Sequence, residues 1–553
     1  MFGTLLHLLY SCDVMSLIFL LCFFIYFILF IVFYNKFRSN KIYIFFCFVP
    51  LIISFIHCVI FTFGSAFTSL FFNYIYIYIF SILIAFIPLF SKKKIVYNTS
   101  KVIIVLFFIF SCIEIISSGE SMNFTRKNLS DSYIALCDYL EKNYIMNDWK
   151  KINYDKLKSD GLVLIKEAEQ TGDLNKYYDA LSNLVDSFHD GHMGLSFYNE
   201  NDYFLEKIKS FNDYGLSLVT LDNGDTIAVD VVDGLDIKSG NVITKWNGLD
   251  IEKAINNVKL PIGEVLLDNE KIIKTFYLSG VGGDSIDVTY INSNNEEVTT
   301  KLNKLDSEIL RGIKSFSTFN HTHDDELFDY KMLSDDIGYL KVGIEEIDEI
   351  SDSVAYLTGN HTKAREKFRT YLRNLRSQGM KKLVIDIRNN KGGSDDVATA
   401  LVSLFTKEKM YAFSLGYRSN GKNISLDNHY VLADGEFSDI PVVVLTNMRC
   451  GSAGDGLVLY FSRIDGINIA GLTNPGGINQ ETGGKIFMPL GAVISYPTGL
   501  VLDQDLNPNI DVDYTRVSRN PVDIKIPFDR DAALKIFSGV DYELEWAIDY
   551  LKK

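Results

Sequence analysis

The chain has 553 residues, a formal net charge of −15 and 48% hydrophobic residues. This length predicts more than one domain, and the acidic balance excludes binding to nucleic acid through phosphate contacts. The hydrophobic residues are concentrated before residue 118, and most of the acidic residues follow it. The chain is therefore predicted to combine an apolar N-terminal region with an acidic, multi-domain C-terminal part.

Residues 1–118 are predicted to form an all-α transmembrane region of four helices in a lipid bilayer. The four apolar segments are residues 14–34, 42–64, 66–90 and 102–117. The first three are long enough to cross a membrane, whereas the fourth is shorter and contains Glu114. The four spans are typical of an anchor, and they leave room for a membrane-protein partner.

The charges between these segments predict the orientation of the chain. Lys and Arg cluster at residues 35–41 and 91–101, and positively charged loops stay in the cytoplasm. With four spans, the N-terminus and the C-terminal part then lie outside the cytoplasm, as in a multi-pass protein of a bacterial cell membrane. If the fourth segment does not cross, the C-terminal part is cytoplasmic instead.

Residues 119–198 are predicted to form a helical cap. Apolar residues recur there at three- and four-residue spacing, which is typical of amphipathic helices. The segment ends in the tripeptide Asp190-Gly191-His192. A polar turn of this kind is a candidate position for a functional histidine.

Residues 199–310 are predicted to form a small β domain, because short β patterns alternate with Gly and Asn-Gly turns. The segment resembles a PDZ domain in its Gly215-Leu216 pair and in residues 240–243 and 247–248. The resemblance implies that Gly215 and Leu216 bind the end of an extended peptide. A small β domain without a ligand is the alternative.

Residues 311–553 are predicted to form an α/β core. An apolar strand pattern at residues 383–390 leads into Gly392-Gly393, and a second at residues 441–447 leads into a Gly-Ser-Ala-Gly turn at Ser452. Helical patterns follow both turns. Strands that alternate with helices in this way favour a sheet covered by helices.

Ser452 is the candidate nucleophile of the chain. A serine at a strand-to-helix turn, flanked by glycines, can be exposed for attack on a substrate. The alternative is an ordinary turn in which the serine caps the helix, and the local sequence alone favours that alternative. Cys450 lies two residues earlier, but a small buried residue is the more natural interpretation of that cysteine.

Three separated stretches, at residues 190–195, 386–393 and 452–455, decide between these interpretations. Their order, with the PDZ-like segment between the first two, resembles the C-terminal processing (tail-specific) peptidases over residues 122–553. The resemblance implies a serine endopeptidase that cleaves peptides or proteins through an acyl-enzyme on Ser452. It also implies an oxyanion hole formed by the N–H groups of Gly393 and Ala453, with Gly392 beside them. No metal and no organic cofactor are expected.

The base that activates the serine departs from the pattern of most relatives. Most members of the family use a lysine in a Thr-x-Gly-Lys segment, but here Gly477 occupies the corresponding position, and the nearest lysine is Lys485. A branch that includes the tricorn-like and nisin-resistance-type peptidases uses a histidine of the Asp-Gly-His stretch instead. His192 fits that branch, with His189 as the competitor.

The acid that would orient this histidine is left open. Glu481, Asp503 and Asp505 are the candidates, and each one singly could be an ordinary loop acid. The polar segment at residues 321–326 is expected to be a solvated loop and not a metal site. The missing lysine also motivates an alternative function, a catalytically inactive peptidase fold that acts as a membrane-anchored binding or sensory protein.

Overall fold

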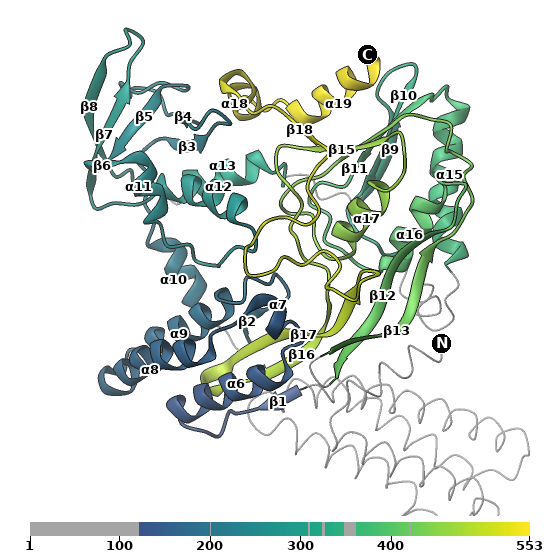
Figure 1. The fold of residues 1–553 in the computed structure, drawn as a ribbon. Coiled ribbons are helices and arrows are strands. Elements are labelled where there is room, and N and C mark those ends of the chain that lie inside the picture. Colours follow the sequence, from purple (N-terminus) through teal and green to yellow (C-terminus); the bar gives the residue numbers. More distant parts are fainter. Residues whose placement is uncertain (1–120, 199–200, 308–309, 323–326, 348–360, 420–421) are drawn as a thin grey trace, which may run out of the picture.

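The computed structural model describes residues 121–198, 201–307, 310–322, 327–347, 361–419 and 422–553 (Figure 1). Its centre is a six-stranded sheet with the order β18-β15-β14-β11-β10-β9. All neighbouring strands are parallel except the β9–β10 pair. The strands are β9 (Phe328–Met332), β10 (Ile337–Val342), β11 (Lys382–Asp386), β14 (Val442–Leu445), β15 (Ile467–Gly471) and β18 (Ile524–Lys525).

Both faces of this sheet are buried, which explains the continuous apolar runs of β11 and β14. Leu383 and Ile385 point into one hydrophobic cluster, whereas Val384 between them points into another. The first cluster contains residues of α15 (Thr362–Ser377), α16 (Asp395–Ser403) and α17 (Ala453–Phe461). The second contains residues of α18 (Arg530–Phe537) and α19 (Tyr542–Lys552). The predicted sheet covered by helices is therefore present.

A second sheet has the order β1-β16-β17-β12-β13, and β2 also pairs with β17. Its strands are β1 (Ser121–Asn123), β2 (Gly194–Phe197), β12 (Met410–Ser419), β13 (Lys422–Val431), β16 (Glu481–Phe487) and β17 (Ala492–Leu502). The β2–β17 pairing, with Leu195 opposite Ile494, brings the Asp-Gly-His turn to the C-terminal half of the chain.

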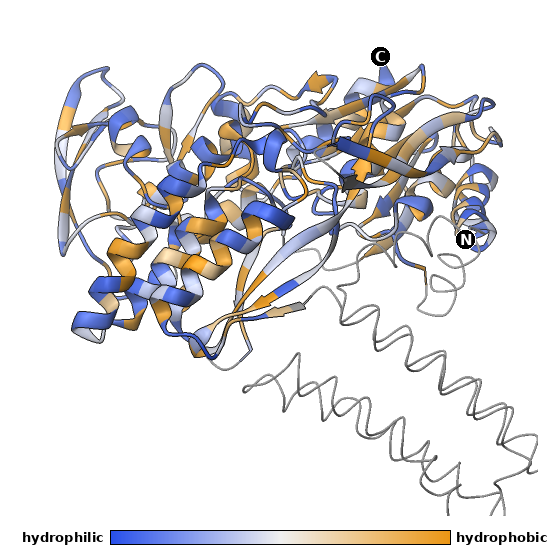
Figure 2. Ribbon diagram, turned by 60° about the horizontal axis from the view of Figure 1, so that its bottom comes forward, coloured by the Kyte–Doolittle hydropathy of each residue, from blue (hydrophilic) through white to orange (hydrophobic). Residues whose placement is uncertain are grey.

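Helices of the N-terminal described segment pack on this second sheet and share a hydrophobic cluster with β16 and β17. They are α6 (Leu129–Asn143), α7 (Asn147–Lys150), α8 (Tyr154–Thr171) and α9 (Leu174–Asp186). In Figure 2 they carry both hydrophilic and hydrophobic residues, as expected of helices with one face on a core and one in water.

The small β domain lies at one end of the molecule (Figure 1). It contains β3 (Ser217–Thr220), β4 (Thr226–Val229), β5 (Val242–Trp246), β6 (Leu249–Asp250), β7 (Ser285–Ile291) and β8 (Glu297–Asn303). Its helices are α11 (Ile251–Asn256) and α12 (Leu267–Leu278), with α10 (Tyr203–Lys209) before it and α13 (Arg311–Phe319) after it. Val219 and Phe276 share a hydrophobic cluster with Tyr339 of the central sheet, so the domain is packed onto the core.

The predicted transmembrane region is not supported, and this part of the predicted fold class is corrected. In the described part of the chain, no helix is both long and apolar enough to cross a membrane. The four predicted spans fall within residues 1–120, which lie outside the described residues. The fold class that the structure supports is a mixed α/β core with additional sheets. The predicted location outside the cytoplasm depended on those spans and is not tested.

Candidate active site

Ser452 occupies the turn between β14 and α17, as the sequence predicts. Its backbone has φ 57° and ψ −132°, a conformation that a non-glycine residue adopts only under constraint. The constraint comes from both sides, because Ser452 N–H donates to Ile478 O over 2.9 Å and Gly451 N–H donates to Asn390 O over 3.1 Å. The Ser452 side chain makes no capping hydrogen bond to the helix. Ser452 therefore occupies the N-cap position of α17 without capping the helix through its hydroxyl.

The Gly392-Gly393 turn lies directly against Ser452. A Cβ atom on Gly392, whose φ is 84°, would overlap the Cβ atom of Ser452, so a side chain cannot be accommodated there. Gly392 N–H donates to Asn390 Oδ1 over 2.8 Å, which turns the loop. The N–H groups of Gly393 and Ala453 have no acceptor among the described residues. They are thus available for a developing oxyanion, whereas the N–H of Gly392 is occupied.

Glu345 lies behind this turn and was not predicted from the sequence. Its backbone N–H donates to Gly392 O over 3.0 Å, and its carbonyl accepts from Ser394 N–H over 3.0 Å. Its side chain is buried, and Oε1 accepts a hydrogen bond of 2.6 Å from Asn390 Nδ2. Burial raises the pKa of Glu345 to about 8. Glu345 therefore holds the Gly392-Gly393 turn in place from the core side.

A second buried acid, Asp455, holds the loop on the other side of Ser452. Its Oδ2 atom accepts from Gly477 N–H over 2.6 Å and from Ile478 N–H over 3.0 Å, and its Oδ1 atom accepts from Asn520 Nδ2 over 3.1 Å. Burial raises the pKa of Asp455 to about 7. The Ile478 carbonyl that binds Ser452 is thereby fixed through the first turn of α17.

The structure gives no lysine the position of a general base. Gly477, which stands where most relatives have the lysine, has φ 76°, and a Cβ atom on it would lie 3.0 Å from Leu266 Cδ2. Lys485 is exposed in the middle of β16, where it pairs with Ser495 of β17. No backbone hydrogen bond joins Lys485 to Ser452 in the described part of the chain.

His192 lies on the opposite side of the loop that binds Ser452. Gln480 N–H donates to His192 Nδ1 over 3.3 Å, and His192 N–H donates to Asp190 Oδ1 over 2.8 Å. The Ile478 side chain lies between the two turns, because Cβ atoms on Gly191 and Gly451 would lie 2.6 Å and 3.0 Å from its Cδ1 atom. The structure thus brings the Asp-Gly-His turn next to the serine turn, although no hydrogen bond joins His192 to Ser452 among the described residues.

His189 faces a different part of the molecule. Its Nδ1 atom lies 3.2 Å from Glu264 O, in the segment that leaves the small β domain. Burial and the neighbouring Arg516 guanidinium lower the pKa of His189. Its ring is therefore engaged away from the Ser452 turn, and His192 is the better-placed histidine.

Asp511 is the acid that sequence reasoning missed. It is fully buried, and ligand atoms of Asp190, His192 and Asp511 lie within 4.8 Å of one another. Asp511 Oδ2 accepts from Gln480 Nε2 over 2.7 Å and from Asn479 N–H over 2.9 Å, whereas Oδ1 has no partner among the described residues. Burial and the Asp190 carboxylate raise the pKa of Asp511. Its place beside the imidazole is that of an orienting acid.

The same three side chains were tested as a metal site. Asp190 already accepts His192 N–H on Oδ1 and the Tyr144 hydroxyl on Oδ2, at 2.8 Å each. Asp511 Oδ2 is also occupied, whereas Asp511 Oδ1 has no hydrogen-bond partner among the described residues. Both oxygens of Asp190 and one of Asp511 are thus engaged by protein donors, which leaves too few free carboxylate oxygens for a well-formed metal centre.

The other predicted residues lie elsewhere. Asp503 Oδ1 accepts from the N–H groups of Asp505 and Asn507, at 2.9 Å each, and its Oδ2 lies 3.3 Å from Arg519 Nη2, so it stabilises a surface turn. Asp505 is exposed in that turn. Glu481 begins β16 opposite Gly499 of β17.

Cys450 is fully buried, and burial raises the pKa of its thiol well above the usual range, which excludes a reactive thiolate.

Residues 336–514 match the model of peptidase family S41. This segment contains Ser452, the Gly392-Gly393 turn and Asp511. It is a serine-type peptidase domain. The match confirms the peptidase resemblance, whereas it does not distinguish the histidine-using branch from the others.

The fold resembles that of mature CPAF at low sequence identity, and other solved peptidase structures match with lower TM-scores. Mature CPAF complexed with lactacystin has a TM-score of 0.50 and 14% identity, over 77% of this chain and 97% of that one. A putative peptidase from Parabacteroides merdae has a TM-score of 0.42 and 17% identity, over 77% and 98% of the two chains. The photosystem II D1 C-terminal processing protease has a TM-score of 0.33 and 17% identity, over 75% and 98%. A search of curated protein sequences finds no match.

Proposed function

We propose that the chain is a serine endopeptidase that cleaves peptides or proteins through an acyl-enzyme on Ser452. The observation that carries the proposal is the Ser452 turn itself. Its serine is held in a constrained conformation without a capping bond, beside the N–H groups of Gly393 and Ala453, for which the described residues provide no acceptor. A nucleophile next to two aimed N–H donors is the arrangement that acyl transfer requires.

His192 is the proposed base, and its ring must change its hydrogen bonds to act. While His192 Nδ1 accepts the Gln480 N–H, a neutral imidazole carries its proton on Nε2 and cannot take another one there. Substrate binding is proposed to move the ring and, by proton exchange with water, to shift its proton from Nε2 to Nδ1. Nδ1–H then donates to Oδ1 of Asp511, and Nε2 faces Ser452 as an acceptor. Hydrogen bonds of catalytic groups are often formed only in the substrate complex.

The chemical steps then follow from these groups. Ser452 Oγ bonds to the scissile carbonyl carbon, its proton passes to His192, and the carbonyl oxygen becomes an oxyanion held by Gly393 and Ala453. The C–N bond breaks, and the leaving amine takes the proton from His192. Water then attacks the ester in the same manner, which releases the carboxylic acid and restores Ser452.

The second part of the proposal is that the small β domain binds a peptide. Binding there would break hydrogen bonds that exist within the domain. Gly215 N–H donates to Asp213 Oδ1 over 2.7 Å, and Leu216 is fully buried. The neighbouring Leu218 N–H donates to Ser279 Oγ of the α12 C-terminus over 2.9 Å. A peptide added to β3 would have to displace Ser279, so this domain is proposed to bind peptide only after α12 moves aside.

The proposal is tested by incubating an unfolded protein substrate with the full chain and identifying the fragments by mass spectrometry. The wild type is expected to produce fragments, and Ser452→Ala is expected to produce none. The matched control is Ser462→Ala at the other end of the same helix, where the hydroxyl donates to Leu459 O. Equal cleavage by wild type and Ser452→Ala would contradict the proposal. A complete lack of cleavage would favour the inactive, ligand-binding alternative.

A further inference from the structure

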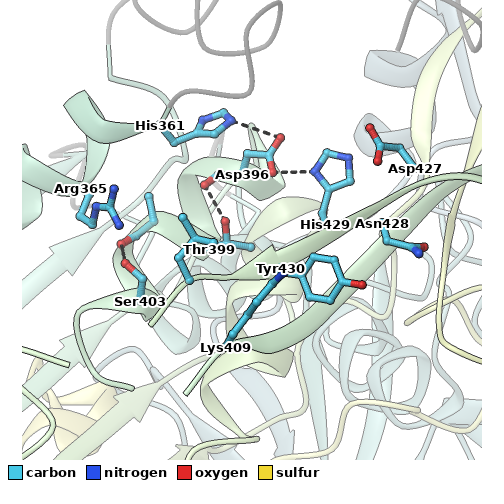
Figure 3. Close-up of a pocket in the computed structure, with 12 residues that line it drawn as sticks. His361, Arg365, Asp396, Thr399, Ser403, Lys409, Asp427, Asn428, His429 and Tyr430 are labelled. Atoms are coloured by element: carbon cyan, nitrogen blue, oxygen red, sulfur yellow. Dashed lines mark hydrogen bonds and ion pairs between the residues drawn. The ribbon is translucent and has the colours of Figure 1, made fainter. Parts of the chain in front are cut away.

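A pocket of about 270 Å³ lies between helices α15 and α16 and the β12–β13 hairpin (Figure 3). None of its lining residues belongs to the Ser452 turn, the Gly392-Gly393 turn or the His192 cluster. A volume of this size suits a ligand no larger than a capped amino acid. The pocket is therefore a candidate for a second, separate site.

The pocket is built around one carboxylate that two imidazoles flank (Figure 3). Asp396 Oδ1 lies 2.8 Å from His429 Nδ1, and Asp396 Oδ2 lies 3.4 Å from His361 Nε2. The His429 ring stacks on Phe413 of β12, with 4.4 Å between ring centroids, which fixes its orientation. Asp396, His361 and His429 come from three different elements, so the cluster joins α16, α15 and β13.

The outer nitrogens of both imidazoles have no partner in the described part of the chain. These are Nδ1 of His361 and Nε2 of His429. A metal would need three ligand atoms close together, but the group that meets this condition among the described residues is Asp190, His192 and Asp511, not this one. The free nitrogens are therefore assigned to hydrogen bonding and not to metal coordination.

The pocket is lined by two cationic side chains, Arg365 and Lys409, and by two carboxylates. Arg365, one helical turn after His361 on α15, forms no ion pair with any described residue. Lys409 Nζ lies 3.8 Å above the Tyr430 ring. The facing acids are Asp396, whose two oxygens already meet the imidazoles, and Asp427. Protonation of His429 adds one positive charge to this balanced set, and the pocket then attracts anions.

Two apolar side chains of the pocket lining are open to water. Tyr430 is 37% exposed and Leu432 is 51% exposed. A ligand with a hydrophobic body would cover this surface. Its charged group would then face α15.

We propose that this pocket binds a small organic anion, whose oxyanion group meets Arg365 and His361 and whose apolar body rests on Tyr430 and Leu432. Arginine binds carboxylates and phosphates through its planar fork, so both chemistries match the pocket. The pocket residues are not part of the proposed catalytic steps. Binding of an anion in this pocket does not depend on whether Ser452 is catalytic.

Protonation of His429 adds charge to the site. Although burial opposes it, the hydrogen bond to Asp396 raises the pKa of His429, and Asp427 and Asp395 act in the same direction. His429 therefore keeps its proton to a higher pH than a free imidazole does. An anion is expected to bind more tightly at pH 6 than at pH 8.

Isothermal titration calorimetry on the full chain tests the inference. N-acetylphenylalanine supplies a carboxylate with an aromatic body, its amide is the neutral control, and phenyl phosphate replaces the carboxylate by a phosphate. N-acetylphenylalanine is expected to bind the wild type at pH 6. Its binding is expected to be at least about 10-fold weaker at pH 8, and also at least about 10-fold weaker in Arg365→Gln. Its amide is expected not to bind. The tighter of the two anions identifies the preferred oxyanion.

The matched control is Arg373→Gln, two turns further along α15. Arg373 is exposed and forms a bidentate pair with Glu436, with distances of 2.6 and 2.9 Å, and it does not line the pocket. This variant is expected to bind the anion as the wild type does. Binding that survives in Arg365→Gln would place the ligand elsewhere, for example at Ser452, and would overturn the proposal. Absence of binding by either anion at pH 6 would also overturn it.

Discussion

Gln480 donates its backbone N–H to His192 Nδ1 over 3.3 Å. Two residues earlier in the same loop, Ile478 O accepts the Ser452 N–H over 2.9 Å. One short loop thus connects the proposed nucleophile to the proposed base, and the buried Asp455 fixes the start of that loop. Because the elements that supply these groups are far apart in the sequence, the geometry of this loop decides whether they can act together.

Substituting Gly392 tests the close approach of the oxyanion turn. Gly392→Ala would place a methyl group closer to Ser452 Cβ than two carbon atoms can approach. Peptide cleavage is expected to fall by a factor of about 100 or more, the loss typical of a disrupted oxyanion hole. Gly224→Ala is the control, because Gly224 has a similar φ of 90° and open space around it. Equal activity in the two variants, measured as kcat/KM, would contradict the assignment.

Asp511 is predicted to orient His192 and thereby to support proton transfer. Asp511→Asn is expected to lower kcat by a factor on the order of 100 to 10,000 with little change in KM, because the imidazole loses its preferred orientation. Asp503→Asn removes an acid of a surface turn and is expected to leave kcat unchanged. A drop of kcat in Asp503→Asn and not in Asp511→Asn would mean that Asp503, the acid predicted from the sequence, orients His192.

Gly477 is predicted to be required for its backbone conformation. Gly477→Ala is expected to lower the free energy of unfolding by about 1 to 3 kcal/mol, because a side chain at φ 76° is strained and meets Leu266. Gly466→Ala shares the positive φ, of 85°, but has no neighbour within 4 Å. Urea unfolding should show a larger loss for Gly477→Ala. An equal loss would mean that Leu266 does not restrict this position.

Glu345 predicts a pH dependence of stability. The pKa of Glu345 is raised to about 8 in the folded chain by burial, whereas it is about 4.5 for the free side chain. The folded state therefore holds this proton more tightly, and the resulting stability is complete below about pH 4.5 and is lost as the pH rises to 8. In Glu345→Gln this contribution to the slope, at most about 1.4 kcal/mol per pH unit, should vanish.

The control for this measurement is Glu346→Gln, which replaces the exposed neighbouring acid. Urea unfolding between pH 5 and pH 8 should give the wild-type slope for Glu346→Gln and a flatter one for Glu345→Gln. If the slope of Glu345→Gln equals that of the wild type, Glu345 is not a protonated group in the folded chain.

The sequence could predict those parts of the site that have a recognisable pattern in a few consecutive residues. The Ser452 turn and the Gly392-Gly393 turn each follow a buried apolar strand, and both could be placed before the structure. The sequence around Asp511 gives only a weak indication that this acid is buried, namely its two apolar neighbours Ile510 and Val512, which are both buried in the structure. Its role depends on how the segment after β17 packs beside His192, and no spacing rule expresses that packing.

The same limit applies to the other features that the structure adds. His361, Asp396 and His429 belong to three elements, so nothing in their spacing indicates that they meet. The predicted transmembrane region rested on hydropathy alone, and the described part of the chain contains no helix of that kind. Local patterns thus predicted the α/β core and its turns, whereas contacts between distant segments required the structure.

The proposed peptidase activity requires that Ser452 is an activated nucleophile. Labelling the full chain with a serine-reactive fluorophosphonate, followed by mass spectrometry of the adduct, tests it most directly. The wild type and Ser462→Ala are predicted to carry the adduct on Ser452, His192→Ala is predicted to react far more slowly, and Ser452→Ala is predicted to carry no adduct. An unlabelled wild type, or equal labelling of Ser452→Ala, would contradict the account.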